Sequence, residues 1–197
     1  MKALVTGGAG FIGSRLVERL AGENDILVLD NLLTGGLDNL KPYWKYIKFV
    51  EGDVRDPKIV ERCAAKADYI FHFAAISDIK RCSKNPQMAY SINADGALNV
   101  LVAARASGTR RVILASTAAV YNDVDTKHRE GERIQPQSMY GLSKMNAENL
   151  CKYFNDSEEL DTITLRYFNV YGPLQKGGVI NSFLDRIINR ENVVING

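Results

Sequence analysis

Tyr140 and Lys144 are the two residues of this chain whose types and spacing most directly suggest chemistry. They lie four positions apart in the stretch 138–144 (SMYGLSK), a spacing that places both side chains on one face of a helix. An ammonium beside a phenol favours the ionised phenolate. A free phenol ionises near pH 10, so work as a base near neutrality needs roughly 3 pK units of help, about 4 kcal/mol. We predict that Tyr140 exchanges a proton with a substrate and that Lys144 supports its ionisation.

A glycine-rich stretch at 7–13 (GGAGFIG) follows the apolar, β-prone run 2–6 and precedes a helical pattern. The order strand, tight turn, helix is typical of a dinucleotide-binding site, whereas glycines alone would be weak evidence. The glycines permit the turn, let the backbone approach a pyrophosphate and let the helix pack closely on the strand. The N-terminus of the helix then faces the phosphates. The cofactor-binding residues predicted here are Gly7, Gly10, Phe11, Ile12 and Gly13.

The run 25–30 (DILVLD) predicts a second strand that ends in the carboxylate of Asp30, followed at once by Asn31. This is the distance at which a carboxylate binds the hydroxyls of the adenosine ribose. Asp30 favours NAD over NADP because it would repel a 2′-phosphate, and the nearest basic residue downstream, Lys41, is not at the strand end to compensate. The alternative is that Asp30 only caps a turn.

The rest of the chain alternates strand and helix patterns. Further strands are expected at 46–50, 67–73, 110–115 and 161–167, and helices at 11–20, 57–65, 86–107 and 139–155. This alternation predicts right-handed crossovers and a parallel sheet covered on both faces, an α/β, doubly wound, Rossmann-like fold. We assign residues 1–172 to this domain. Residues 173–197, with a helix at 179–189 and a strand at 193–195, are expected to begin a small substrate domain that continues in a longer protein.

Composition excludes several classes of protein. The chain has 197 residues, of which 46% are hydrophobic, enough for one core, and no segment is long and apolar enough to span a membrane. No signal peptide is visible. The three cysteines are scattered without metal-ligand spacing, which predicts reduced thiols in the cytoplasm and no metal site. The net charge of +2, with both signs interspersed, does not indicate binding to nucleic acid.

Hydroxyl side chains follow the strand expected at 110–115, in the stretch 116–121 (STAAVY). They would lie at the carboxyl end of a central parallel strand, where open α/β sheets bind ligands. We predict that Thr117 binds a substrate oxygen while Tyr140 transfers the proton and a nicotinamide exchanges the hydride. Alternatively, Ser116 and Thr117 only satisfy backbone groups at the strand end.

Six motifs occur in order along nearly the whole chain: 7–13 (GGAGFIG), 52–54 (GDV), 72–75 (HFAA), 116–121 (STAAVY), 140–144 (YGLSK) and 165–173 (LRYFNVYGP). As a set they resemble extended short-chain dehydrogenase/reductases of the NAD-dependent sugar-nucleotide epimerase/dehydratase group, most of all its UDP-glucose 4-epimerases. The resemblance implies NAD as cofactor and a nucleotide sugar, such as a UDP-hexose, as substrate.

The resemblance also implies roles for individual residues. Asp53 and Val54 would border the adenine, Asn93 would support hydrogen bonds of the site, and Asn169 would approach the diphosphate of the substrate. The further cofactor-binding residues it implies are Asn31, Asp53, Val54, Phe73, Ala74, Ala75, Asn93, Ser116, Tyr140, Lys144 and Tyr167, and the substrate-binding residues are Thr117, Tyr140 and Asn169. Each has an ordinary structural alternative, since buried polar groups are usually just paired.

Ala118 and Ala119 follow the catalytic hydroxyl, where dehydratases of the group resemble one another in an acidic pair that eliminates water. Without such a pair, the resemblance implies 4-epimerisation by transient oxidation at C4. Two alternatives stay open. One is another sugar-nucleotide dehydratase or reductase of the same family, although Asp30 argues against a keto-sugar reductase, and the other is an NAD-binding fragment or pseudo-enzyme without turnover. The resemblance also implies a homodimer through the helices 86–107 and 139–155, although their apolar positions equally suit packing on the sheet.

Overall fold

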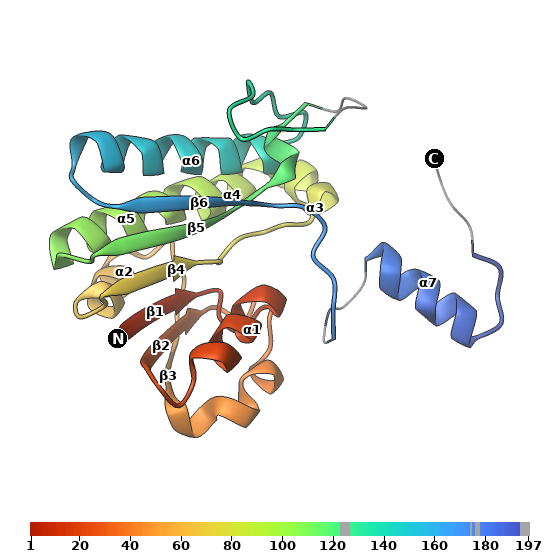
Figure 1. Ribbon diagram of the computed structural model, residues 1–197, viewed down its shortest axis with the longest axis horizontal. Helices are drawn as coiled ribbons and strands as arrows, with labels where there is room; N and C mark the ends of the chain where they lie inside the picture. Colours follow the sequence, from red (N-terminus) through yellow and green to blue (C-terminus); the bar gives the residue numbers. More distant parts are fainter. Residues whose placement is uncertain (123–126, 174, 176–177, 194–197) are drawn as a thin grey trace.

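A six-stranded parallel sheet forms the centre of the computed structural model, which describes residues 1–122, 127–173, 175 and 178–193 (Figure 1). The strands are β1 (Lys2–Thr6), β2 (Asp25–Asp30), β3 (Ile47–Glu51), β4 (Tyr69–His72), β5 (Arg111–Thr117) and β6 (Thr162–Tyr167). Their order is β3-β2-β1-β4-β5-β6, and each neighbouring pair is parallel. The chain reverses its direction of travel across the sheet between β1 and β4, and such a switch opens a crevice at the carboxyl ends of the strands. The predicted α/β, doubly wound fold is confirmed.

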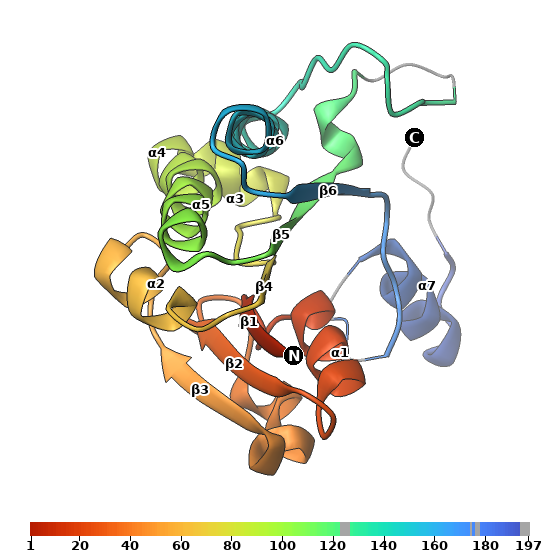
Figure 2. The same ribbon diagram turned by 60° about the vertical axis from the view of Figure 1, so that its left-hand side comes forward.

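Helices cover both faces of the sheet. They are α1 (Phe11–Leu20), α2 (Pro57–Ala64), α3 (Ile79–Lys84), α4 (Pro86–Tyr90), α5 (Gly96–Ser107), α6 (Met139–Ser157) and α7 (Val179–Ile188). Figure 2 shows α2, α5 and α6 on one face and α1 on the other. Helix α7 lies beyond β6, apart from the sheet, and has no buried residue (Figure 1). No helix within the described ranges combines the length and apolar character needed to cross a membrane.

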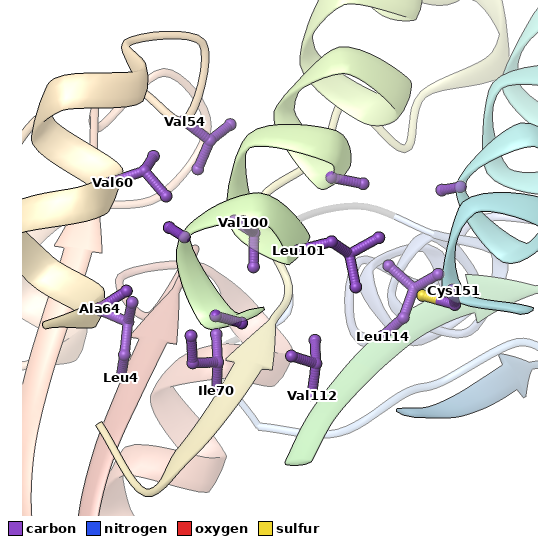
Figure 3. Close-up of a cluster of buried hydrophobic side chains, with 14 of the residues drawn as sticks. Leu4, Val54, Val60, Ala64, Ile70, Val100, Leu101, Val112, Leu114 and Cys151 are labelled. Carbon is purple, nitrogen blue, oxygen red and sulfur yellow. The ribbon is translucent and has the colours of Figure 1, made fainter. Parts of the chain in front are cut away.

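Alternation along the strands divides the core between the two faces. Residues at every second position of β1, β4 and β5 pack against α2, α5 and α6, and the intervening positions of β1 and β2 pack against α1. Figure 3 shows the first cluster, with Leu4, Val54, Val60, Ala64, Ile70, Val100, Leu101, Val112, Leu114 and Cys151 labelled. Burying one such Leu or Ile side chain stabilises the fold by roughly 1.5–3 kcal/mol. Burial of these side chains therefore determines which residues of each strand face α2, α5 and α6 and which face α1.

The helix predicted at 86–107 is not one regular α-helix. A π-helical turn, η3 (Ser91–Asp95), joins α4 to α5. The wider turn directs Ile92, Asn93 and Ala94 into the interior, and Asn93 is 0% exposed. Helix α3 was not predicted, because six residues are too few for a hydrophobic period. The strand predicted at 193–195 lies outside the described residues except for Val193.

Candidate active site

The turn between β1 and α1 has room only for glycine at its closest approaches. Gly7 has a φ of 70°, and a Cβ there would lie 2.5 Å from the backbone nitrogen of Ala74. A Cβ at Gly13 would lie 2.3 Å from the carbonyl oxygen of Gly7. Gly10 is the N-cap of α1, and no side-chain hydrogen bond caps the helix there. The turn thus presents backbone amides at a helix N-terminus, the usual site for a phosphate.

Asp30 ends β2 beside this turn and is 8% exposed. Its Oδ2 accepts a hydrogen bond from the amide of Ala9 at 2.9 Å, and its Oδ1 accepts one from Leu32 at 2.8 Å. Burial raises the pKa of this carboxyl, and the two amide hydrogen bonds oppose the rise. Asp30 therefore caps the turn, which was the structural alternative to a role in binding the cofactor. It also lines the smaller cavity.

Asp53, which follows β3, is held by Arg55, two residues along the chain, and by Asn31, which the fold brings from the end of β2. Asn31 donates to its Oδ2 at 2.8 Å, and the guanidinium of Arg55 donates to Oδ1 and Oδ2 at 3.0 and 2.8 Å. The hydrogen bonds from Arg55 are the main cause that lowers the pKa of Asp53 to about 2. Sequence reasoning missed Arg55 and named Lys41 as the nearest basic residue along the chain. Lys41 instead pairs with Asp38 at 2.6 Å.

Two adjoining cavities of about 720 and 70 Å³ lie along the carboxyl ends of the strands. The larger one is lined by the predicted residues Gly7, Gly10, Phe11, Ile12, Gly13, Phe73, Ala75, Ser116, Thr117, Tyr140, Lys144, Tyr167 and Asn169. The smaller one shares Gly7, Gly10, Phe73 and Ala75 and adds Asp30, Asn31, Val54 and Ala74. Asp53 and Asn93 line neither. Most of the predicted residues, distant in sequence, are thus brought to one site.

Several residues that line the larger cavity were not predicted. They include Thr34 after β2, Ser77 and Ile79 between β4 and the start of α3, and Val170, Tyr171, Gln175, Val179 and Ile180 on the path from β6 into α7. These residues lie in loops or at the ends of helices, where hydrophobic periods give no signal. The position of Thr34 shortly after Asp30 and Asn31 is the one cue in the sequence that could have indicated it.

Lys144 lies on α6 one turn after Tyr140, as predicted. It is 2% exposed, and its Nζ has no hydrogen-bond partner among the residues that the structure describes. Burial is the main cause that lowers its pKa to about 8. Burial also raises the pKa of Tyr140, and a hydrogen bond with Thr117 opposes that rise. In the chain without a cofactor, burial therefore raises the pKa of Tyr140, whereas the ammonium of Lys144 was expected to lower it.

Helix α6 approaches the end of β5 very closely. The N-cap Ser138 accepts a hydrogen bond from the amide of Gly141 at 3.0 Å, which fixes the start of the helix. A Cβ at Gly141 would lie 2.2 Å from the carbonyl oxygen of Ala119, in the short 3₁₀ turn η4 (Ala118–Val120). This close approach is what brings Tyr140 to the side chain of Thr117.

The hydroxyls of Ser116 and Thr117 have different surroundings. Thr117 Oγ1 accepts a hydrogen bond from the amide of Ala119 at 3.1 Å, so it also serves the backbone. Ser116 contributes to the cavity lining, but its hydroxyl donates to Glu148 on α6. Asn93 lies behind the site, where its amide group bonds the backbone of Ile76 at 2.8 and 3.0 Å and Ser143 Oγ at 3.0 Å.

These features fit a nicotinamide dinucleotide. The glycine turn leaves room for a pyrophosphate, and the carboxylate of Asp30 lines the smaller cavity. The ammonium of Lys144 is buried and, among the described residues, unpartnered, and Lys144 lines the same cavity as Tyr140. Fold and site together define a protein of the Rossmann-like, dinucleotide-dependent class.

Comparison with known proteins places the chain within this class. Residues 3–197 match the NAD dependent epimerase/dehydratase family, and the chain belongs to that family. The expected NAD dependence is therefore confirmed at the level of the family.

Relatives with different named activities match over nearly the whole chain. A putative UDP-glucose 4-epimerase of Methanocaldococcus jannaschii is 36% identical over 98% of this chain and 65% of its own length. The UDP-glucose 4-epimerase of Thermus thermophilus, solved with NAD, is 36% identical with a TM-score of 0.90, covering 98% of this chain and 64% of that one. The dTDP-glucose 4,6-dehydratase DesIV of Streptomyces venezuelae, also solved with NAD, is 32% identical with a TM-score of 0.90, covering 96% and 63%. The chain thus spans less than two thirds of the length of these relatives.

Proposed function

We propose that this chain carries the NAD-binding and catalytic part of a sugar-nucleotide 4-epimerase that acts on a UDP-hexose. The observation that carries the proposal is the meeting of Thr117, Tyr140 and Lys144 at one cavity lined by Ala118 and Ala119. The names of the relatives support a sugar nucleotide as substrate.

In the proposed reaction, Tyr140 removes the proton of the sugar 4-hydroxyl and later returns it to the keto oxygen. NAD, when bound, would supply the acceptor and donor of the hydride at C4 of the sugar. Thr117 holds the reacting oxygen by a hydrogen bond. The positive charge of Lys144 stabilises the phenolate of Tyr140 and binds the nicotinamide ribose.

Epimerisation is favoured over dehydration by the side chains around the cavity. Elimination of water from a sugar requires an acid and a base besides the tyrosine. Of the described residues that line the larger cavity, none is Asp or Glu, and methyl groups stand at Ala118 and Ala119. Reduction by NADPH is disfavoured because Asp30 would repel a 2′-phosphate.

The substrate end of the site is formed by Asn169 and the segment that leads from β6 to α7. Arg15 on α1 holds this segment through a hydrogen bond to the carbonyl oxygen of Pro173 at 3.0 Å. We propose that Asn169 approaches the diphosphate, that residues 1–172 form the cofactor domain, and that residues 173–197 begin the substrate domain. The exposed apolar face of α7 supports this division.

A homodimer through α4–α5 and α6 is part of the proposal. Leu98, Val102 and Tyr153 on these helices expose 38%, 52% and 54% of their surface, so the sheet does not cover them. Exposed apolar side chains of this kind are typical of protein–protein interfaces. Sedimentation equilibrium of the wild-type chain and of a Val102→Lys variant would test it. A dimeric wild type and a monomeric variant are expected, and a monomeric wild type would refute the dimer.

Calorimetric titration with NAD and NADP, followed by UDP-glucose and NMR detection of UDP-galactose, tests the function. We expect NAD binding, weaker NADP binding and interconversion that a Tyr140→Phe variant abolishes. NAD binding without interconversion would favour a cofactor-binding fragment without turnover, while a dehydrated product would replace epimerisation with another reaction of the family.

A further inference from the structure

Glu148 lies on the same helix as the two predicted catalytic residues but takes no part in the proposed chemistry. It follows Lys144 by four residues and Tyr140 by eight, so the three side chains share one side of α6. Only 8% of Glu148 is exposed. A buried carboxylate requires partners, and those of Glu148 lie on two strands of the sheet.

The carboxylate of Glu148 joins α6 to β5 and β6. The hydroxyl of Ser116 on β5 donates to its Oε1. Arg166 on β6 donates from Nε to Oε1 and Oε2 at 3.1 and 3.2 Å, and from Nη2 to Oε2 at 2.8 Å. Two-point pairing between a guanidinium and a carboxylate fixes direction as well as distance. Helix α6 therefore cannot shift or rotate at Glu148 without breaking contacts to both strands.

Strand register connects this contact to the catalytic hydroxyl. Ser116 pairs with Arg166 across β5 and β6, and Thr117 pairs with Tyr167. Because successive side chains of a strand point to opposite faces, the side chains of Ser116 and Arg166 meet α6 while those of Thr117 and Tyr167 point to the other face. Thr117 and Tyr167 line the cavity, which Ser116 also borders. Glu148 thus holds Ser116, the residue directly before Thr117, against α6, the helix that carries Tyr140.

Arg166 extends the same network toward the segment after β5. Its Nη1 donates to Tyr121 Oη and to the carbonyl oxygen of Glu130, both at 2.9 Å. The Tyr121 ring stacks on His128 with 4.4 Å between ring centroids. Glu148 thus joins the helix to both strands, and its partner Arg166 connects the pair to this segment.

We propose that Glu148 is a positioning residue, which through Ser116 fixes the distance between Thr117 on β5 and Tyr140 on α6. The geometric part stands on the described contacts, and the catalytic consequence rests on the proposed function. The negative charge of Glu148 also opposes the fall in the pKa of Lys144 that burial causes, so the same carboxylate supports the ammonium one turn away.

Ser116→Ala is the most informative variant, because it breaks the link to β5 and leaves the pair of Glu148 and Arg166 intact. Ser116→Thr is the conservative variant that keeps the hydroxyl. Thr162→Val is the matched control, since Thr162 Oγ1 also ties a strand to α6, by donating to the carbonyl oxygen of Cys151 at 3.1 Å, but away from the site.

Two readouts separate positioning from stability. The first is the rate at which UDP-glucose reduces NAD at saturating NAD, for which we expect a roughly 10- to 100-fold loss in Ser116→Ala. Ser116→Thr should recover most of the rate, and Thr162→Val should keep it. The second is the nuclear Overhauser effect between the Thr117 methyl group and the Tyr140 ring, which should weaken in Ser116→Ala alone.

The outcomes discriminate between the two proposals. Equal rates and equal Overhauser effects in Ser116→Ala and Thr162→Val would overturn the positioning role. If the wild-type chain does not reduce NAD with UDP-glucose, the proposed function fails, and the Overhauser effect by itself decides whether Ser116 and Glu148 position Thr117.

Discussion

The carboxylate of Asp30 accepts a hydrogen bond from the backbone amide of Ala9 at 2.9 Å, which joins the end of β2 to the glycine turn after β1. The same carboxylate caps the next turn through Leu32 and lines the smaller cavity. One side chain thus holds the pyrophosphate turn in place and stands where the adenosine ribose is expected. Loss of this carboxylate should therefore disturb both the turn and the binding of the ribose.

Asp30→Asn should therefore weaken NAD binding and reduce the preference for NAD over NADP. A hydrogen bond to a charged group contributes about 1.5–3 kcal/mol, so we expect the Kd for NAD to rise roughly 10- to 100-fold. Calorimetric titration with both dinucleotides measures the change. Asp25→Asn, at the exposed start of the same strand, is the matched control and should leave both affinities unchanged. Equal NAD affinity in Asp30→Asn and wild type would remove Asp30 from the cofactor site.

Tyr140→Phe should lose the proposed reaction without losing the cofactor. Proton transfer by a positioned side chain accelerates a reaction by about 10²–10⁴-fold, and we expect kcat to fall by at least the lower figure. Steady-state kinetics and NAD titration give the two values separately. Tyr153→Phe, on an exposed part of the same helix, should match wild type. Retained turnover in Tyr140→Phe would show that another group carries the proton.

Lys144 should make the stability of the cofactor-free chain depend on alkaline pH. Its pKa is about 8 in the folded chain and 10.5 ordinarily, so between these values the unfolded state binds a proton that the folded state lacks. Stability therefore rises with pH through this window, by about 3 kcal/mol in total. Lys144→Met should be more stable than wild type at pH 7, and urea unfolding should show that difference shrinking toward pH 10. A difference that does not change with pH would contradict the buried ammonium.

His72 should make the chain sensitive to acid. It is 1% exposed, bonds Thr6 Oγ1 through Nδ1 at 2.7 Å, and burial is the main cause that lowers its pKa from 6.5 to about 3. Between these two values the unfolded state binds the extra proton, so stability is lost as the pH falls below 6.5. Over the first two pH units of that fall the loss should reach about 2 kcal/mol. His72→Gln should flatten the dependence, measured by urea unfolding at each pH, and an unchanged slope would refute the assignment.

Gly141→Ala should destabilise the fold where α6 meets η4. The added Cβ would meet the carbonyl oxygen of Ala119 at 2.2 Å, and backbone must move to admit it. We expect a loss of about 1–3 kcal/mol in thermal or urea unfolding. Gly36→Ala is the control, because nothing lies within 4 Å of a Cβ there. Equal stability of the two variants would show that α6 can retreat from β5 at little cost.

Local features of the sequence carried the prediction of fold class and of the two main motifs. The glycine turn between a strand and a helix, the carboxylate of Asp30 at a strand end and the spacing of Tyr140 and Lys144 all lie within short segments. Apolar alternation and helical periods placed the six strands and most helices to within a few residues. These signals are local because backbone geometry and side-chain direction repeat over two to four residues.

Contacts between distant segments could not be predicted in this way. The ion pair of Arg55 with Asp53 is close in sequence, yet its place beside Asn31 depends on the pairing of β2 with β3. No local pattern indicated that the Ser116 hydroxyl bonds Glu148, because that contact depends on how β5 packs on α6.

By itself, the sequence determined the order of strands and helices, the glycine turn and the residue types available for proton transfer. Tertiary structure decided that Thr117 and Tyr140 meet, that Lys144 is buried without a partner among the described residues, and that the path from β6 to α7 walls the cavity. The physical reason is that periodicity specifies which face of an element is apolar, whereas close packing of those faces sets the distances and the desolvation on which chemistry depends.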